Sequence, residues 1–72
     1  MTDLAGHLAA GYRHAMHPGG PDPAPACAAE VPREALLAEA RRLEPVQQRC
    51  HISRVRLAFI RRVLDLSPKS AA

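Results

Sequence analysis

The side chains of this 72-residue chain that are able to bind a metal ion are four histidines and two cysteines: His7, His14, His17, Cys27, Cys50 and His51. A structural zinc site usually contains closely spaced cysteine pairs, and these two cysteines are far apart in the sequence. On one helix His7 and His14 would be separated by about 10.5 Å along the axis, too far for one ion whose ligands lie near 2 Å. Only His14 and His17, three residues apart, are spaced so that both could bind the same ion. We therefore expect no metal site and no cofactor.

Nucleophilic catalysis has little support in the same residues. Cys50 is followed by His51, but neighbours on a helix point about 100° apart and do not face each other. The Gly19-Gly20 pair lies between prolines, not between a strand and a helix, so it does not form a phosphate-binding loop. The sequence therefore predicts that the protein is not an enzyme and has no catalytic residues.

Charge is unevenly distributed along the chain. Residues 1–45 carry four arginines and six acids, a net charge of −2, whereas residues 46–72 carry five arginines and one lysine against Asp65, a net of +5. Such asymmetry favours an anionic partner for the C-terminal third. The excess of arginine over lysine, with abundant Ala and Pro, is typical of a GC-rich bacterial genome. Without a secretory leader, a disulfide framework or a transmembrane segment, we expect a cytoplasmic protein with free thiols.

The spacing of apolar residues predicts three segments that position these side chains. Leu4, Leu8, Tyr12 and Met16 recur at helical intervals, which predicts an N-terminal helix over about 3–16 within a unit 1–17, capped by Thr2. The run His17-Pro18-Gly19-Gly20-Pro21 ends it. Four prolines and two glycines then predict a flexible, Pro/Gly-rich linker over 18–30, in which only Ala26–Ala29 would begin to order.

Residues 31–67 are predicted to form a helical hairpin, followed by a disordered tail over 68–72. Pro32 suits the first position of a helix over about 32–44, and Pro45 forces a break or kink. The second helix should cover about 46–66 and end at Ser67-Pro68. The predicted fold class is therefore all-α: a small helical hairpin joined through the linker to a short N-terminal helix.

The C-terminal helix is basic and amphipathic, and it holds the predicted interaction surface. Its apolar stripe, predicted to bind a partner, consists of Ile52, Val55, Phe59, Ile60, Val63 and Leu66. Its arginines, predicted to contact phosphates or the acidic rim of a partner, are Arg49, Arg54, Arg56, Arg61 and Arg62. Leu57 and Leu64 form a second apolar ridge near the back of the helix. A chain this small buries such surfaces only narrowly, so we expect self-association or a partner protein.

Residues 56–67, twelve of the 72, read RLAFIRRVLDLS and resemble the helix that follows the winged helix-turn-helix in MerR-type transcription regulators. That family reads DNA with the helix-turn-helix and wing, which should precede this helix. Residues 1–45 contain neither, so the resemblance does not carry DNA binding to this chain. In outline, the order of short helix, Pro-rich spacer and helical hairpin also looks like small secretion-system subunits and their co-chaperones.

Three functions remain open for the basic helix, beside a purely structural role with its arginines in water. The leading hypothesis is a small non-enzymatic protein–protein interaction module, a regulator, adaptor or chaperone-like subunit that docks through this helix. The alternative is a small nucleic-acid-binding transcriptional regulator that uses the same arginines, although one Tyr and one Phe do not make a base-stacking platform. Adsorption to an anionic membrane is the third; it is the weakest because Asp65 lies in the segment and a preceding helix can cover its apolar face.

Overall fold

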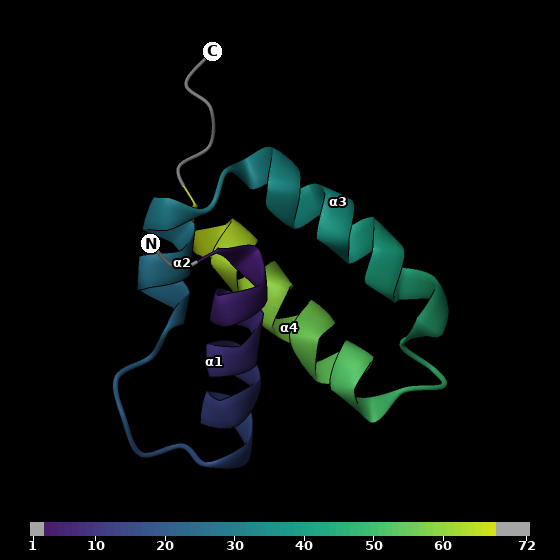
Figure 1. The fold of residues 1–72 in the computed structure, drawn as a ribbon, viewed down its shortest axis with the longest axis horizontal. Helices are drawn as coiled ribbons and strands as arrows, with labels where there is room; N and C mark the ends of the chain where they lie inside the picture. Colours follow the sequence, from purple (N-terminus) through teal and green to yellow (C-terminus); the bar gives the residue numbers. More distant parts are fainter. Residues whose placement is uncertain (1–2, 68–72) are drawn as a thin grey trace.

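The computed structural model describes residues 3–67 and is built from helices (Figure 1). In order along the chain they are α1 (Leu4–Met16), α2 (Ala24–Glu30), α3 (Arg33–Leu43), the short 3-10 helix η1 (Glu44–Val46) and α4 (His51–Leu66). No strand occurs within residues 3–67, so the predicted all-α fold class is confirmed. The predicted cap Thr2 and the predicted disordered tail 68–72 lie outside the described residues.

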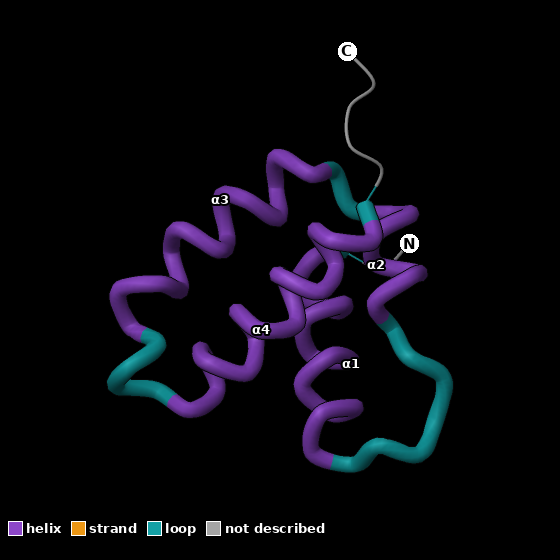
Figure 2. Tube along the Cα trace, turned by 180° about the vertical axis from the view of Figure 1, so that it is seen from behind, coloured by secondary structure: helices purple, strands orange, loops and turns teal. Residues whose placement is uncertain are grey.

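Helix α4 is the central element, and α1, α2 and α3 all pack against it. Figures 1 and 2, which view the molecule from opposite sides, show α3 on one side of α4 and the pair α1 and α2 on the other. The turn after α3 returns the chain to α4, as expected for the hairpin. The loop from α1 to α2 runs on the side away from α3.

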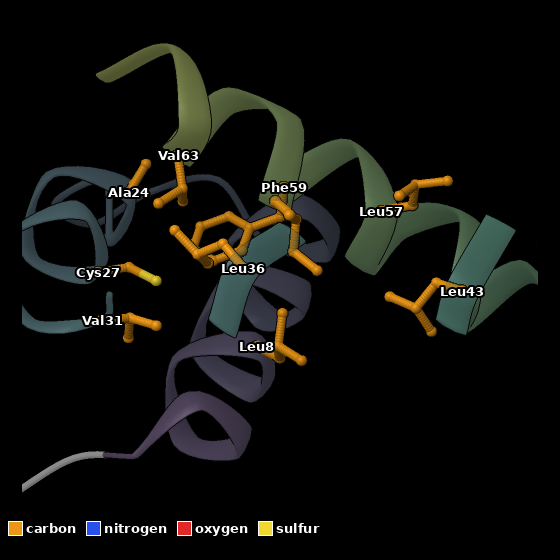
Figure 3. Close-up of a cluster of buried hydrophobic side chains, with 10 residues drawn as sticks. Leu8, Ala24, Cys27, Val31, Leu36, Leu43, Leu57, Phe59 and Val63 are labelled. Atoms are coloured by element: carbon orange, nitrogen blue, oxygen red, sulfur yellow. The ribbon is translucent and has the colours of Figure 1, made fainter. Parts of the chain in front are cut away.

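The core forms where these helices meet (Figure 3). Its buried members are Leu8, Ala24, Cys27, Val31, Leu36, Leu43, Leu57, Phe59, Ile60 and Val63. Four of the ten come from α4, and at 100° per residue they cover an arc of about 160° of its circumference. Such a wide arc explains the second ridge noted in the sequence. Leu57 is buried and Leu64 packs on the core, so this chain's own helices cover the ridge without a second copy or a partner.

Helix α2 lies inside the segment for which the sequence predicted a flexible, extended linker. Pro23 and Pro25 fall at its very start. The N–H groups of the first turn have no carbonyl acceptor within the helix, so a proline there costs no hydrogen bond. The carboxylate of Asp22 accepts the Ala24 N–H at 3.0 Å. Ala24 and Cys27 are completely buried, so packing on the core favours this short helix.

Two boundaries differ from those predicted. Helix α1 is capped by Asp3, whose carboxylate accepts the Gly6 N–H at 3.0 Å, so Asp3 precedes the first turn rather than belonging to it. Helix α4 begins at His51 rather than near Val46, because the chain from Pro45 first forms the 3-10 turn and then a loop up to Cys50. A proline suits the first turn of the 3-10 helix for the same reason that it suits α2.

The side chain of Arg33 links the open end of the hairpin, where α3 begins and α4 ends. The Nη1 of Arg33, at the start of α3, donates a hydrogen bond to the backbone carbonyl of Leu64 at 3.2 Å. Carbonyls in the last turn of a helix have no partner within the helix, and a cation there also favours the helix dipole. Arg33 therefore fixes the C-terminal end of α4 against α3.

Candidate functional site

A groove of about 740 Å³ lies between the C-terminal half of α1 and the first turns of α4. Figure 1 shows these two helices diverging toward the bottom of the view, away from the point where they cross. The lining residues are Ala9, Tyr12, Arg13, Met16 and His17 from α1 and its cap, and Ile52 and Arg56 from α4. The groove therefore combines an apolar surface with three basic side chains.

The crossing of α1 and α4 at Gly11 positions this groove. Gly11 is buried, and a Cβ built on it would lie 2.6 Å from Cγ and Cδ1 of the Phe59 ring. Helices normally pack with their axes 8–10 Å apart, according to the side chains at the contact. A glycine at this point lets the backbone of α1 lie directly on the Phe59 ring. Beyond this contact, toward the C-terminus of α1 and the N-terminus of α4, the two helices separate and the groove opens between them.

The apolar surface of the groove continues the face of α4 that is buried in the core. At 100° per residue, Ile52 lies within about 20° of Phe59 on the helical wheel. Phe59 is 4% exposed, however, whereas Ile52 is 43% exposed because α1 has diverged at its level. On the opposite wall Met16 is 40% exposed. Two large apolar side chains thus remain open to solvent on facing walls.

The polar part of the groove is cationic. Arg13, His17 and Arg56 line it, and no Asp or Glu does so. Within residues 3–67, neither Arg13 nor Arg56 forms an ion pair. The Nε of Arg56 is moreover buried without a hydrogen-bond acceptor among the described residues. An unsatisfied buried donor is costly, by about 1–3 kcal/mol, so Arg56 is incompletely hydrogen-bonded within the described chain, and no carboxylate of residues 3–67 pairs with the cationic side chains of the groove.

The predicted partner-binding stripe is divided by the fold. Its middle residues Phe59, Ile60 and Val63 are buried in the core and present no surface to a partner in this conformation. Val55 is half-buried. Only the two ends of the stripe are exposed: Ile52 lies in the groove, whereas Leu66 lies at the other end of α4 beside α2.

The five arginines predicted to contact phosphates or acids also have different surroundings. Arg62 forms an ion pair with Asp22, in the loop before α2. The Nε of Arg54 donates to the Gln47 carbonyl at 3.3 Å, and Arg56 lines the groove. The other two, Arg49 and Arg61, are exposed. Arg62 and Arg54 thus each contact a loop of this chain, and the predicted role of the five arginines in binding a partner stays a prediction.

Among residues 3–67 no three side chains of the metal-binding types come together. His14 and His17 do share a shallow hollow with Arg13 and Pro21, but a third ligand is missing there. His7 is buried, with its Nε2 lying 3.9 Å from Glu30 of α2. His14 and His17 therefore share the hollow, with His17 also lining the groove, whereas His7 lies in the interface between α1 and α2.

The two thiols differ in their surroundings and in the direction of their pKa values. Burial and the nearby Glu30 carboxylate raise the pKa of the Cys27 thiol. Cys50, at the start of α4, is only partly buried, and hydrogen bonding with the hydroxyl and amide of Ser53 lowers the pKa of its thiol. Cys27 therefore acts as a small apolar core residue, and Cys50 is the thiol that we expect to react first.

Sequence reasoning missed the α1 side of the groove. The sequence places Tyr12 and Met16 in an apolar helical stripe but assigns that stripe no binding role. The available signal was Gly11: a glycine within an apolar helical stripe indicates close approach of another helix. A crossing at Gly11 leaves the residues beyond it without a partner.

No helix within residues 3–67 has the length and apolarity needed to cross a bilayer. Comparison of the chain with protein-family models, with curated proteins and with solved structures finds no match. The local resemblance of residues 56–67 to MerR-type regulators is thus not accompanied by a family match, and the groove between α1 and α4 stands as the candidate site on its geometry alone.

Proposed function

We propose that the protein is a non-enzymatic interaction module that binds a helical segment of a partner protein in the groove between α1 and α4. The observation that carries the proposal is the exposure of Met16 and Ile52 on facing walls of one groove. Fully burying a side chain of this size contributes about 1.5–3 kcal/mol. Since each is about 40% exposed, covering both recovers on the order of 2 kcal/mol.

The walls of the groove favour a helix over an extended peptide. Both walls are α-helices, whose backbone groups are already hydrogen-bonded within the helix, so neither offers the free edge on which an extended peptide adds as a strand. A bound helix satisfies its own backbone and needs only side chains to enter the groove.

A matched pair of variants tests the groove as the binding surface. Ile52→Glu places a charge in the groove, and Leu37→Glu places the same charge on α3 at a residue of similar exposure, 40% against 43%. An unbiased displayed-peptide library is selected on the purified wild-type protein, and the enriched peptides are then titrated against both variants. Far-ultraviolet circular dichroism checks that the variants remain helical.

The expected result is that enriched peptides bind the wild type and Leu37→Glu with similar affinity and bind Ile52→Glu at least tenfold more weakly. Failure to enrich any peptide, or equal binding to both variants, overturns the proposal. A gel-shift titration with duplex DNA at low salt serves as the second arm. Retardation that falls steeply with salt and persists in Ile52→Glu identifies a nucleic-acid-binding protein instead.

A further inference from the structure

The charge around the groove identifies the chemical class of its occupant. We infer that the groove receives an acidic amphipathic helix, in which Asp or Glu residues flank an apolar stripe, on a protein other than this one. This inference rests on the proposed function. It adds that acidic amphipathic helices should bind in the groove and that basic ones should bind much more weakly.

The first argument is charge complementarity. Three basic side chains line the groove, namely Arg13, His17 and Arg56, and no Asp or Glu does so. The arginines elsewhere in the described chain include several that already have partners: Arg62 pairs with Asp22 and Arg42 with Glu39. Arg13 and Arg56 have no carboxylate partner within residues 3–67, so carboxylates on an incoming helix would complete their interactions.

The second argument comes from the position of Arg56 on α4. Arg56 is only partly buried, lines the groove and forms no ion pair among residues 3–67, although it also shares a second hollow with Glu39 on α3. Guanidinium groups favour carboxylates, which accept two parallel hydrogen bonds. Ile52 lies one turn before Arg56 on α4, so an apolar side chain placed on Ile52 brings the flank of the same incoming helix to Arg56.

The third argument excludes a second copy of this chain as the occupant. None of its three longer helices is acidic: α1 carries only Arg13, α3 carries three arginines against two glutamates, and α4 carries four arginines against Asp65. Like charges placed opposite each other across an interface are strongly unfavourable. The acidic helix must therefore come from another protein.

Three designed peptides test the inference directly. Each is an amphipathic helix of about 18 residues, roughly 27 Å long, with the same leucine face and with Glu, Gln or Lys at the flanking positions. Their affinities for the full chain are measured by fluorescence anisotropy at about 0.02 M and about 0.5 M salt, since screening is much stronger at the higher concentration. The Glu peptide is expected to bind at least tenfold more tightly than the Lys peptide at low salt, with the difference shrinking at high salt.

A charge exchange provides the matched control. Arg13→Glu should weaken the Glu peptide and strengthen the Lys peptide, whereas Arg41→Glu, an exposed position on α3 outside the groove, should change neither by more than the general effect of net charge. Equal binding of the three peptides, with all of it lost in Ile52→Glu, refutes the acidic partner but leaves the groove as the binding site. Absence of binding by every peptide counts against the groove itself. Sedimentation of the protein without peptide should show a monomer, and a dimer lost in Ile52→Glu would identify a second copy as the occupant.

Discussion

Replacement of Gly11 by alanine tests the packing that creates the groove. Helix propensity alone favours the change, since Ala is about 1 kcal/mol better than Gly inside a helix. The structure indicates the opposite outcome. The added methyl would lie 2.6 Å from Cγ and Cδ1 of Phe59 and 2.7 Å from Cδ2, whereas carbon atoms in contact normally lie about 3.5–4.0 Å apart.

The size of the destabilisation depends on whether the Phe59 ring or the two helices must move to accommodate the added methyl group. Cγ of Phe59 lies next to the backbone of α4, and the ring is only 4% exposed, so it cannot swing into solvent without leaving the core. The two helices must instead separate by about 1 Å to restore normal carbon contacts. Overpacking of this kind costs about 1–3 kcal/mol. After subtraction of about 1 kcal/mol for the gain in helix propensity, about 0–2 kcal/mol remains, so we expect Gly11→Ala to lower the free energy of unfolding by about 1 kcal/mol.

Thermal unfolding followed by circular dichroism measures this effect. For a domain of this size a loss of about 1 kcal/mol lowers the midpoint of thermal unfolding by about 4–8 °C, which is the decrease we expect. Gly20→Ala is the control, because no atom lies within 4 Å of the added Cβ, and it should leave the midpoint nearly unchanged. In the background of Phe59→Leu the cost of Gly11→Ala should shrink by about 1 kcal/mol or more, as expected for residues in contact. A higher midpoint for Gly11→Ala, or strict additivity with Phe59→Leu, would refute the close packing.

Two further predictions concern titratable groups. The Ala24 N–H, followed by Arg62, lowers the pKa of Asp22 below its ordinary value of 3.8. The carboxylate is therefore stabilising above that pH, and its contribution is lost as the pH falls through the lowered pKa. The wild type should be more stable than Asp22→Asn near neutral pH, with the gap closing in acid, and a gap that is constant with pH would contradict this. In native protein, iodoacetamide should alkylate the partly exposed Cys50, whose pKa is lowered, well before the buried Cys27, whose pKa is raised; mass spectrometry that finds equal rates would show that Cys27 is not held in the core.

Much of the fold could be predicted from the sequence because apolar spacing and proline act locally. The N-terminal helix and the first helix of the hairpin match α1 and α3 to within one or two residues. Helix α2 could not be predicted in this way, since only seven residues form it and isolated helices that short are unstable in water. It depends on burial of Ala24 and Cys27 against other helices, and composition alone suggested a linker.

The candidate site was predicted only in part, because it depends on where two helices cross. The sequence correctly indicated that α4 carries more apolar surface than one neighbour covers, but it could not indicate which end stays exposed. Ile52 and Phe59 are equivalent on the helical wheel, and only the tertiary contact at Gly11 distinguishes them. Likewise the basic residues of α4 look alike in sequence, whereas Arg62 is paired with Asp22 and Arg56 is not paired within the described residues.

The central position of α4 has a consequence for how the chain folds during synthesis. Helices α1, α2 and α3 all precede α4 in the sequence, yet their apolar faces meet on it. Until α4 has left the ribosome, these three helices have no common surface on which to pack, and short amphipathic helices are marginal by themselves. The nascent chain should therefore remain unstructured and accessible to chaperones until then, and fold in one step when residues 51–66 emerge.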